Sequence, residues 1–243
     1  MRKYILSSII ILFFCLIGTG IVDYGRVQAM EQPEYLSLEV INAADKPLIQ
    51  LREISQIYDW QLVYQAESKT VIINNGEQRV DIKIGNTEYN NQELVAVPQI
   101  KEGRTYISPD LFKYLLNDLE EEKIPALIAG LKLKSEIAAP GDIVKAEISL
   151  INLGTEAVNL NYASGQLYDL FLLDDQQEIW RWSEDKMFTM ALVSKDLEAG
   201  DHLYYKEEIP LMADLNAGEY IVSGKIATRE PLQLPERIIK ITE

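Results

Sequence analysis

The residue types that most often carry chemistry are scarce in this chain. It has one histidine, His202, and one cysteine, Cys15, among 243 residues. Copper sites, catalytic zinc sites and Ser-His-Asp hydrolases normally need a well-placed histidine, and metal sites usually need several. His202 follows Gly200-Asp201, a turn signal, so we expect a solvated loop histidine. The sequence therefore predicts no catalytic residue and no metal ligand.

Carboxylates are abundant, but none of them form a recognisable site. Asp174-Asp175 falls in a short polar segment between two apolar runs, where aspartate is favoured for local reasons of turn formation. The chain has no Asp-x-Asp-x-Asp-Gly calcium loop, no phosphate-binding glycine loop and no dinucleotide fingerprint. Carboxylate-pair catalysis stays open by count alone. We expect no cofactor and no enzyme activity.

Aromatic residues form the most informative pattern. The runs 167–173 and 179–182 flank a polar turn and predict a β-hairpin. Trp180 and Trp182 alternate in the second run, so they share one face of a strand while Arg181 faces the other way. Core packing is the first interpretation of the pair, and an exposed anchor for a partner is the alternative.

The segment Ser183 to Val193 is too polar at its start to continue the strand, yet it is rich in apolar residues. One interpretation is a short helix over the end of a sandwich that buries Phe188 and Leu192. The other is a contact loop that offers Met187 or Met190 to a partner, as adaptable methionine side chains often do. The candidate partner-binding residues are Trp180, Trp182, Ser183, Met187, Phe188 and Met190.

This region resembles the bacterial intracellular proteinase inhibitor (BsuPI) family. The family's Ser-Gly-Gln turn, Tyr-Asp strand, Trp-x-Trp-Ser and Met-Phe are matched by Ser164, Gly165, Gln166, Tyr168, Asp169, Trp180, Trp182, Ser183, Met187 and Phe188. Residues 197–200 and 217–220 fit further motifs, with Ala199 where proline is usual. The resemblance covers residues 128–243 and implies a protein partner, a protease in particular. Short alternating runs with turns every 8–12 residues predict a sandwich there.

The first half of the chain mixes helix and strand patterns. Apolar spacing predicts a helix over 51–58, and Ser108-Pro109-Asp110 has the residues of a helix start, with Ser108 as the cap. Strands are expected at 35–40, 62–64, 70–73, 80–85, 93–97 and 105–107. Residues 46–117 resemble the N-terminal domain of copper amine oxidases, matching it best at 51–64, 69–71, 84–85, 103–107 and Pro109. Asp59 stands where that family usually has glycine. The family module is non-catalytic, so the resemblance implies no copper.

The N-terminus has the pattern of a secretory signal peptide. A basic start precedes an apolar run, and Val27-Gln28-Ala29 predicts cleavage after Ala29. The alternative is an uncleaved membrane anchor, which would be the chain's one membrane contact. Residues 1–29 hold three basic residues and one acidic residue, so the remainder has a formal net charge of −17. That charge argues against nucleic acid and anionic lipid as partners.

The predicted order is a signal peptide (1–29), an α+β N-terminal module (30–117), a linker (118–127) and an all-β immunoglobulin-like sandwich (128–243). We expect a non-enzymatic, protein-binding protein that is secreted or held in the cell envelope. Proteinase inhibition is one form of that function. The alternative is an envelope adaptor that binds another wall or surface component without inhibiting it. The single histidine, in an expected turn, and the lack of any cysteine after residue 29 disfavour a hydrolase.

Overall fold

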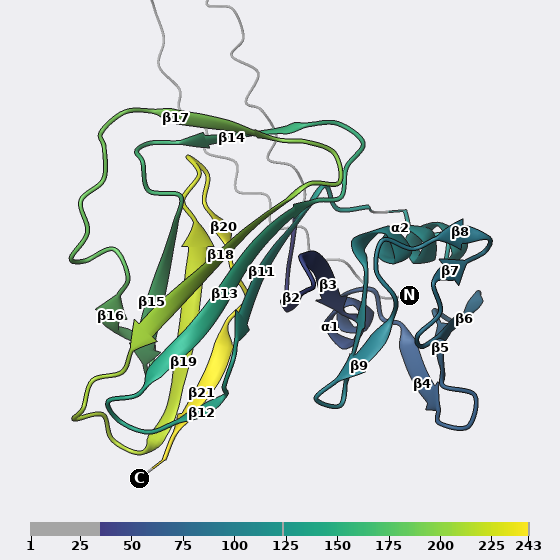
Figure 1. The fold of residues 1–243 in the computed structure, drawn as a ribbon, viewed down its shortest axis with the longest axis horizontal. Helices are drawn as coiled ribbons and strands as arrows, with labels where there is room; N and C mark the ends of the chain where they lie inside the picture. Colours follow the sequence, from purple (N-terminus) through teal and green to yellow (C-terminus); the bar gives the residue numbers. More distant parts are fainter. Residues whose placement is uncertain (1–34, 123, 243) are drawn as a thin grey trace, which may run out of the picture. The chain divides into compact units, whose positions relative to one another are not determined.

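The computed structural model describes residues 35–122 and 124–242, and the predicted signal peptide lies outside these residues. Residues 32–243 form one compact unit. Its regular structure is mostly β-strand, and the two helices among the described residues both precede residue 119 (Figure 1). Neither has the length and hydrophobicity that a membrane span requires.

Two large sheets build the second half of the chain. The first has the strand order β1-β11-β13-β18, and the second has the order β12-β21-β19-β15-β16 with β20 beside β19. Their bounds are β1 Tyr35–Leu38, β11 Leu127–Leu133, β12 Ile137–Ala138, β13 Ile143–Asn152, β15 Tyr168–Asp174, β16 Gln177–Arg181, β18 His202–Pro210, β19 Gly218–Ile226, β20 Leu232–Gln233 and β21 Arg237–Ile241. One hydrophobic core receives alternate residues from both sheets, which is the arrangement of a sandwich. The ribbon of β14 (Val158–Tyr162) and β17 (Val193–Leu197) lies across one end (Figure 1).

The first half of the chain has smaller sheets and both helices. One sheet has the order β2-β3-β10-β9, a second is the meander β4-β5-β6, and β7 pairs with β8. The bounds are β2 Val40–Ala43, β3 Lys46–Gln50, α1 Leu51–Ile57, β4 Gln61–Gln65, β5 Thr70–Asn74, β6 Arg79–Lys83, β7 Glu88–Tyr89, β8 Gln92–Glu93, β9 Gln99–Lys101, β10 Arg104–Ile107 and α2 Pro109–Asp118. The buried faces of both helices share a second core with the meander.

Local signals explain both helices. Leu51 and Ile54 are fully buried, as their spacing requires, and α1 ends before Asp59. Asp59 adopts a φ of 57°, the left-handed conformation that glycine usually supplies after a helix. Pro109 opens α2 as predicted. Ser108 occupies the cap position, but its buried hydroxyl makes no cap hydrogen bond, so its predicted capping role is wrong.

Strand β11 is buried on both faces. Leu127, Ala129 and Leu131 point into the sandwich core, whereas Ile128 joins the core of the first half. Gly130 allows this close packing, because a Cβ there would lie 2.5 Å from Val40 Cγ2. Strand β1 pairs in parallel with β11, so a segment that we placed in the N-terminal module extends the sheet of the sandwich.

Two further expectations were wrong. The strand expected at 93–97 is reduced to the short β8. The Val95 N–H donates to Asp110 Oδ2 (2.8 Å) at the start of α2 instead of to a neighbouring strand. His202 is not a loop residue. It begins β18 opposite Ile151 and is half-buried. The predicted boundary at 118–127 and the independence of the two halves remain predictions.

Candidate functional site

The hairpin β15–β16 places the two tryptophans as their spacing predicts. Trp180 pairs with Leu172, and both Trp180 and Trp182 pack against the sandwich core. Arg181 pairs with Phe171 on the outer face of the sheet, with its guanidinium carbon 5.0 Å from the centroid of that ring. The tryptophans therefore belong to the core side of the sheet and are half-buried there.

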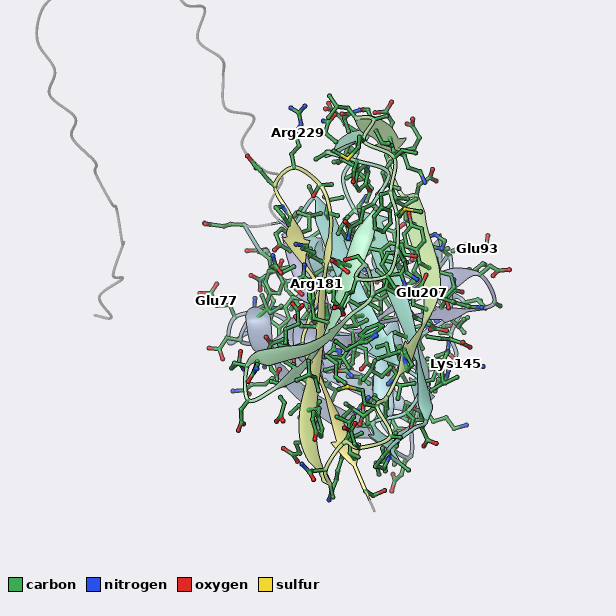
Figure 2. The ribbon with its side chains drawn as sticks, turned by 90° about the vertical axis from the view of Figure 1, so that its left-hand side faces the viewer. Glu77, Glu93, Lys145, Arg181, Glu207 and Arg229 are labelled. Carbon is green, nitrogen blue, oxygen red and sulfur yellow. The ribbon has the colours of Figure 1, made fainter. Side chains whose placement is uncertain are left out.

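Trp182 connects the two sheets at their open edges. Its Nε1–H donates to Glu207 Oε2 at 2.6 Å, and the hydroxyl of Tyr168 donates to the other oxygen of the same carboxylate. Glu207, labelled in Figure 2, lies on β18, an edge strand of the opposite sheet. The rings of Tyr168 and Trp182 are 4.6 Å apart, and Tyr205 lies 4.7 Å beyond Tyr168. Burial and the bond to Glu207 raise the pKa of Tyr168, so the phenol stays protonated and keeps donating.

A buried aspartate fixes the turn after Trp182. Asp169 is 2% exposed, and its Oδ2 accepts a hydrogen bond from Ser183 Oγ at 2.8 Å. Its Oδ1 accepts from the Ser183 N–H at 3.2 Å. A buried carboxylate needs such donors, and the contact in turn holds the chain where it leaves β16. Ser183 is thus a positioning residue for the segment that follows.

We call residues 186–192, within the segment 183–193, the contact loop. Phe188 packs on Trp182 with ring centroids 5.9 Å apart, and Lys186 Nζ lies 4.5 Å from the centroid of the same ring. The Gly165 N–H donates to the Thr189 carbonyl at 2.9 Å. A Cβ at Gly165 would meet Thr189 Oγ1 at 2.6 Å, so any larger residue here would force Thr189 to shift. The contact loop is held from both sides by residues of the family motif.

Between these anchors the contact loop exposes apolar side chains. Met187 is 100% exposed, Met190 91% and Leu192 68%. The expected short helix is wrong, because no residue from 183 to 192 is helical and Leu192 is not buried. The bond from Gly165 holds the backbone at Thr189 in an irregular path. The exposed methionines are the more notable because neither belongs to any hydrophobic core of the described residues.

Glu207, Tyr205 and Thr189 take part in this arrangement although the sequence did not single them out. A signal for Glu207 existed. Leu203, Tyr205, Glu207 and Ile209 alternate along one strand, which places a glutamate on the core-facing side. A charged residue at such a position needs a partner, and here two aromatic donors supply it.

A second group of charged residues lies where the N-terminal elements meet the sandwich. Glu39, between β1 and β2, is 2% exposed, accepts a hydrogen bond from the hydroxyl of Tyr106 and forms an ion pair with Lys132 Nζ at 3.4 Å. Beside it is a pocket of about 320 Å³. Arg104 and Arg237 line the pocket, but each already has a carboxylate partner at 2.7 Å, namely Glu136 and Glu53. The cations of this group are therefore already paired with carboxylates within it. Among the described residues, no cluster of His, Cys, Asp and Glu has a metal-binding arrangement.

Comparison with known proteins gives two family matches. Residues 131–231 match the profile described as "Intracellular proteinase inhibitor" (BsuPI), and residues 30–117 match the "Copper amine oxidase N-terminal domain". Both resemblances stated from the sequence motifs are confirmed. The second half of the chain resembles the inhibitor family and the first half resembles the oxidase module. No curated protein matches the chain significantly.

Solved structures give only distant similarities. Spo0M, a sporulation control protein from Bacillus subtilis, is 16% identical with a TM-score of 0.34, over 49% of this chain and 51% of its own. The β-glucosidase EmGH1 from Erythrobacter marinus is 11% identical with a TM-score of 0.30, over 50% of this chain and 16% of its own. The C-terminal domain of wzt is 13% identical with a TM-score of 0.33, over 49% of this chain and 74% of its own. The chain covers about half of the length of Spo0M and less than a fifth of the length of the glucosidase. All three TM-scores lie below 0.5, so these similarities support no conclusion about function.

Proposed function

We propose that this chain, whose second half resembles the intracellular proteinase inhibitors, is an exported protein that binds another protein and has no enzymatic activity of its own. The contact loop is the binding element, and a proteinase is the partner that the family resemblance favours. The observation that carries the proposal is the pair Met187 and Met190, which is almost fully exposed on a segment that is tied to the sandwich.

The contact loop has the physical properties of a binding loop. Inhibitory loops bind tightly when they are held in the bound conformation beforehand, because less conformational entropy is lost on association. Phe188 on Trp182, and Thr189 bonded to Gly165, provide that restraint here. Met187 and Met190 lie on either side of these anchors and supply unbranched apolar side chains that fit pockets of varied shape.

Export changes which proteinase the protein could meet. The family name refers to intracellular inhibitors, whereas residues 1–29 have the pattern of a signal peptide. We therefore place the protein in the cell envelope or outside the cell, and its target with it. N-terminal sequencing of the protein from its native host should begin at Met30. A chain that still begins at Met1 in the membrane fraction would support the anchor alternative.

The test of the binding function uses aspartate substitutions in the contact loop. We expect the purified protein to inhibit at least one member of a panel of subtilisin-like, chymotrypsin-like and trypsin-like serine proteinases. Met187→Asp and Met190→Asp should each weaken inhibition about tenfold or more, because a buried apolar side chain contributes about 1.5–3 kcal/mol. Melting temperatures should stay within about 2 °C, since both side chains are exposed.

Met212→Asp is the matched control, because Met212 is also a surface methionine, 38% exposed, but lies after β18 and outside the contact loop. Its inhibition should equal that of the unchanged protein. If Met187→Asp and Met190→Asp, measured as folded proteins, inhibit as strongly as the Met212→Asp control, the contact loop is not the binding element.

An envelope adaptor without inhibitory activity is the second candidate, and one observation favours it. Leu173, Ile221 and Ile238 pair in register across β15, β19 and β21, on the outer face of the sandwich. Ile238 is 58% exposed. Such a row suits a flat contact with another wall or surface component. Ile238→Asp should then abolish retention of the protein in the envelope fraction while proteinase assays show no inhibition by either form.

We also propose the finer fold assignment that the sequence suggested. The two helices and the small sheets before residue 119 form an α+β module, and the two-sheet unit is an immunoglobulin-like sandwich. The support is the division of the cores, since one contains α1, α2 and the meander and the other contains both large sheets.

A further inference from the structure

The described residues contain three methionines, and their placement is unusual. Methionine most often fills gaps in hydrophobic cores. None of Met187, Met190 and Met212 belongs to a hydrophobic core here, and two of the three are more than nine-tenths exposed. No cysteine lies among the described residues, so these thioethers are the oxidisable sulfur atoms of that part of the chain.

The contact loop holds both sulfur atoms outward without using them for its own stability. Phe188 packs on Trp182, and the Thr189 carbonyl accepts from Gly165. These anchors lie between Met187 and Met190 in the sequence, so the backbone is fixed at residues other than the methionines. A chemical change at either sulfur would therefore alter the surface of the contact loop and leave its anchors intact.

We propose that Met187 and Met190 form a modification site at which hydroperoxides oxidise the contact loop and switch off its binding, an inference that rests on the proposed binding function. Each thioether sulfur attacks the terminal oxygen of a hydroperoxide, and the O–O bond breaks. The sulfur loses two electrons and becomes a sulfoxide, and with hydrogen peroxide the departing hydroxide takes up the proton of the transferred hydroxyl and leaves as water. The product replaces a flexible apolar side chain by a polar one.

The effect on binding and the effect on the fold should be separate. A sulfoxide oxygen that enters an apolar pocket loses its hydration without gaining a donor. We expect the doubly oxidised protein to bind its partner at least about tenfold more weakly. Because no core of the described residues contains a methionine, the melting temperature should not move.

The experiment treats the full chain with increasing hydrogen peroxide and follows each methionine by peptide mass mapping, at about 16 Da per oxygen added. Met187 and Met190 should be oxidised before Met212, and inhibition should fall as they are. A mixture of the two methionine sulfoxide reductases, one for each epimer, should restore it. The Met187→Leu/Met190→Leu variant has no sulfur in the contact loop, so the inhibition that it shows before treatment should be the same after peroxide.

Three results would overturn the inference. Met212 could be oxidised as fast as the loop pair, the doubly oxidised protein could retain full inhibition, or the leucine variant could lose inhibition to peroxide as quickly as the unchanged protein. If the unoxidised protein binds no proteinase, the proposed function fails, and the mass mapping by itself still decides whether the pair is the preferred oxidation site.

Discussion

Substituting Glu39→Gln tests the buried charges that link the first half of the chain to the sandwich. The side chain of Glu39 is 3% exposed and that of Lys132 is 9% exposed, with 3.4 Å between Oε1 and Nζ. Arg104 Nη1 lies 3.4 Å from the other carboxylate oxygen. The substitution preserves the size of the side chain and removes its charge. Lys132 is then left with Glu102 and Glu136, both at 3.9 Å and both largely exposed.

The expected cost follows from that burial. Removing one partner of a buried ion pair typically costs about 3–5 kcal/mol, because the remaining charge is uncompensated in a region that excludes water. For a chain of this size each kcal/mol lowers the melting temperature by about 2–4 °C, so Glu39→Gln should melt about 6–20 °C lower. Adding Lys132→Met should recover part of the loss, since it removes the uncompensated charge.

The pH dependence gives an independent readout. Burial raises the pKa of Glu39, but the hydrogen bond from Tyr106 and the charges of Lys132, Arg237 and Arg104 outweigh it and hold the pKa below the ordinary value of 4.5. A carboxyl group whose pKa is depressed by folding stabilises the protein above its unfolded pKa. That stability is lost as the pH falls through the folded pKa. The free energy of unfolding should therefore decline below about pH 4.5, and less steeply in Glu39→Gln.

Urea denaturation, followed by tryptophan fluorescence and circular dichroism at pH 7 and pH 4, measures both effects. Glu77→Gln is the control, because Glu77 is an exposed turn residue (Figure 2) and should change stability by less than about 0.5 kcal/mol. A cost below about 1 kcal/mol at pH 7, or an acid slope equal to that of the unchanged protein, would refute the reasoning. Transitions that separate by probe would show that the two halves unfold independently.

Further substitutions test three close contacts. Gly130→Ala places a Cβ 2.5 Å from Val40 Cγ2, so stability measured in urea should fall by about 2–3 kcal/mol, and an unchanged midpoint would contradict the tight packing. Gly165→Ala should weaken partner binding, because its Cβ displaces Thr189, and adding Thr189→Ala to that variant should restore binding. Additive effects in the double variant would show that the two residues are not coupled. Trp182→Ala should lower the free energy of unfolding by about 2–4 kcal/mol, because the ring is half-buried. Trp182→Phe loses only part of the ring and the bond to Glu207, so calorimetry should show a loss of about 1 kcal/mol.

Elements specified by short-range signals could be predicted from the sequence. The helix α2 begins at Pro109 because proline suits the first helical position and stops a strand from continuing, both local effects. Strands β4, β5 and β6 follow the alternation of their own residues. The strand expected at 93–97 was lost to one contact from Asp110, fifteen residues away, which no local pattern contains.

Burial that depends on distant partners could not be predicted. Leu131-Lys132-Leu133 alternates like a strand with one face in water, yet Lys132 is only 7% exposed. Its side chain is covered because Glu39 and the N-terminal elements pack over that face of β11. Ile128 and Gly130 on the same face are apolar, but Lys132 itself gives no sign of this second layer, since a lysine on a strand is normally exposed.

The candidate site likewise combines features that local sequence patterns predicted with contacts that depend on distant residues. The sequence left two interpretations for the tryptophan pair, core packing or an exposed anchor, and placed Met187 in the next segment, itself either a short helix or a contact loop. In the structure Trp182 packs against the core, donates to Glu207 and supports Phe188. The same ring therefore belongs to the core side of the sheet and holds the contact loop. The exposed apolar side chains are those of the methionines near Phe188, and Trp182 supports Phe188. Core packing and partner binding are then linked through Trp182, so a substitution there should change both stability and binding, whereas a substitution at Met187 should change binding alone.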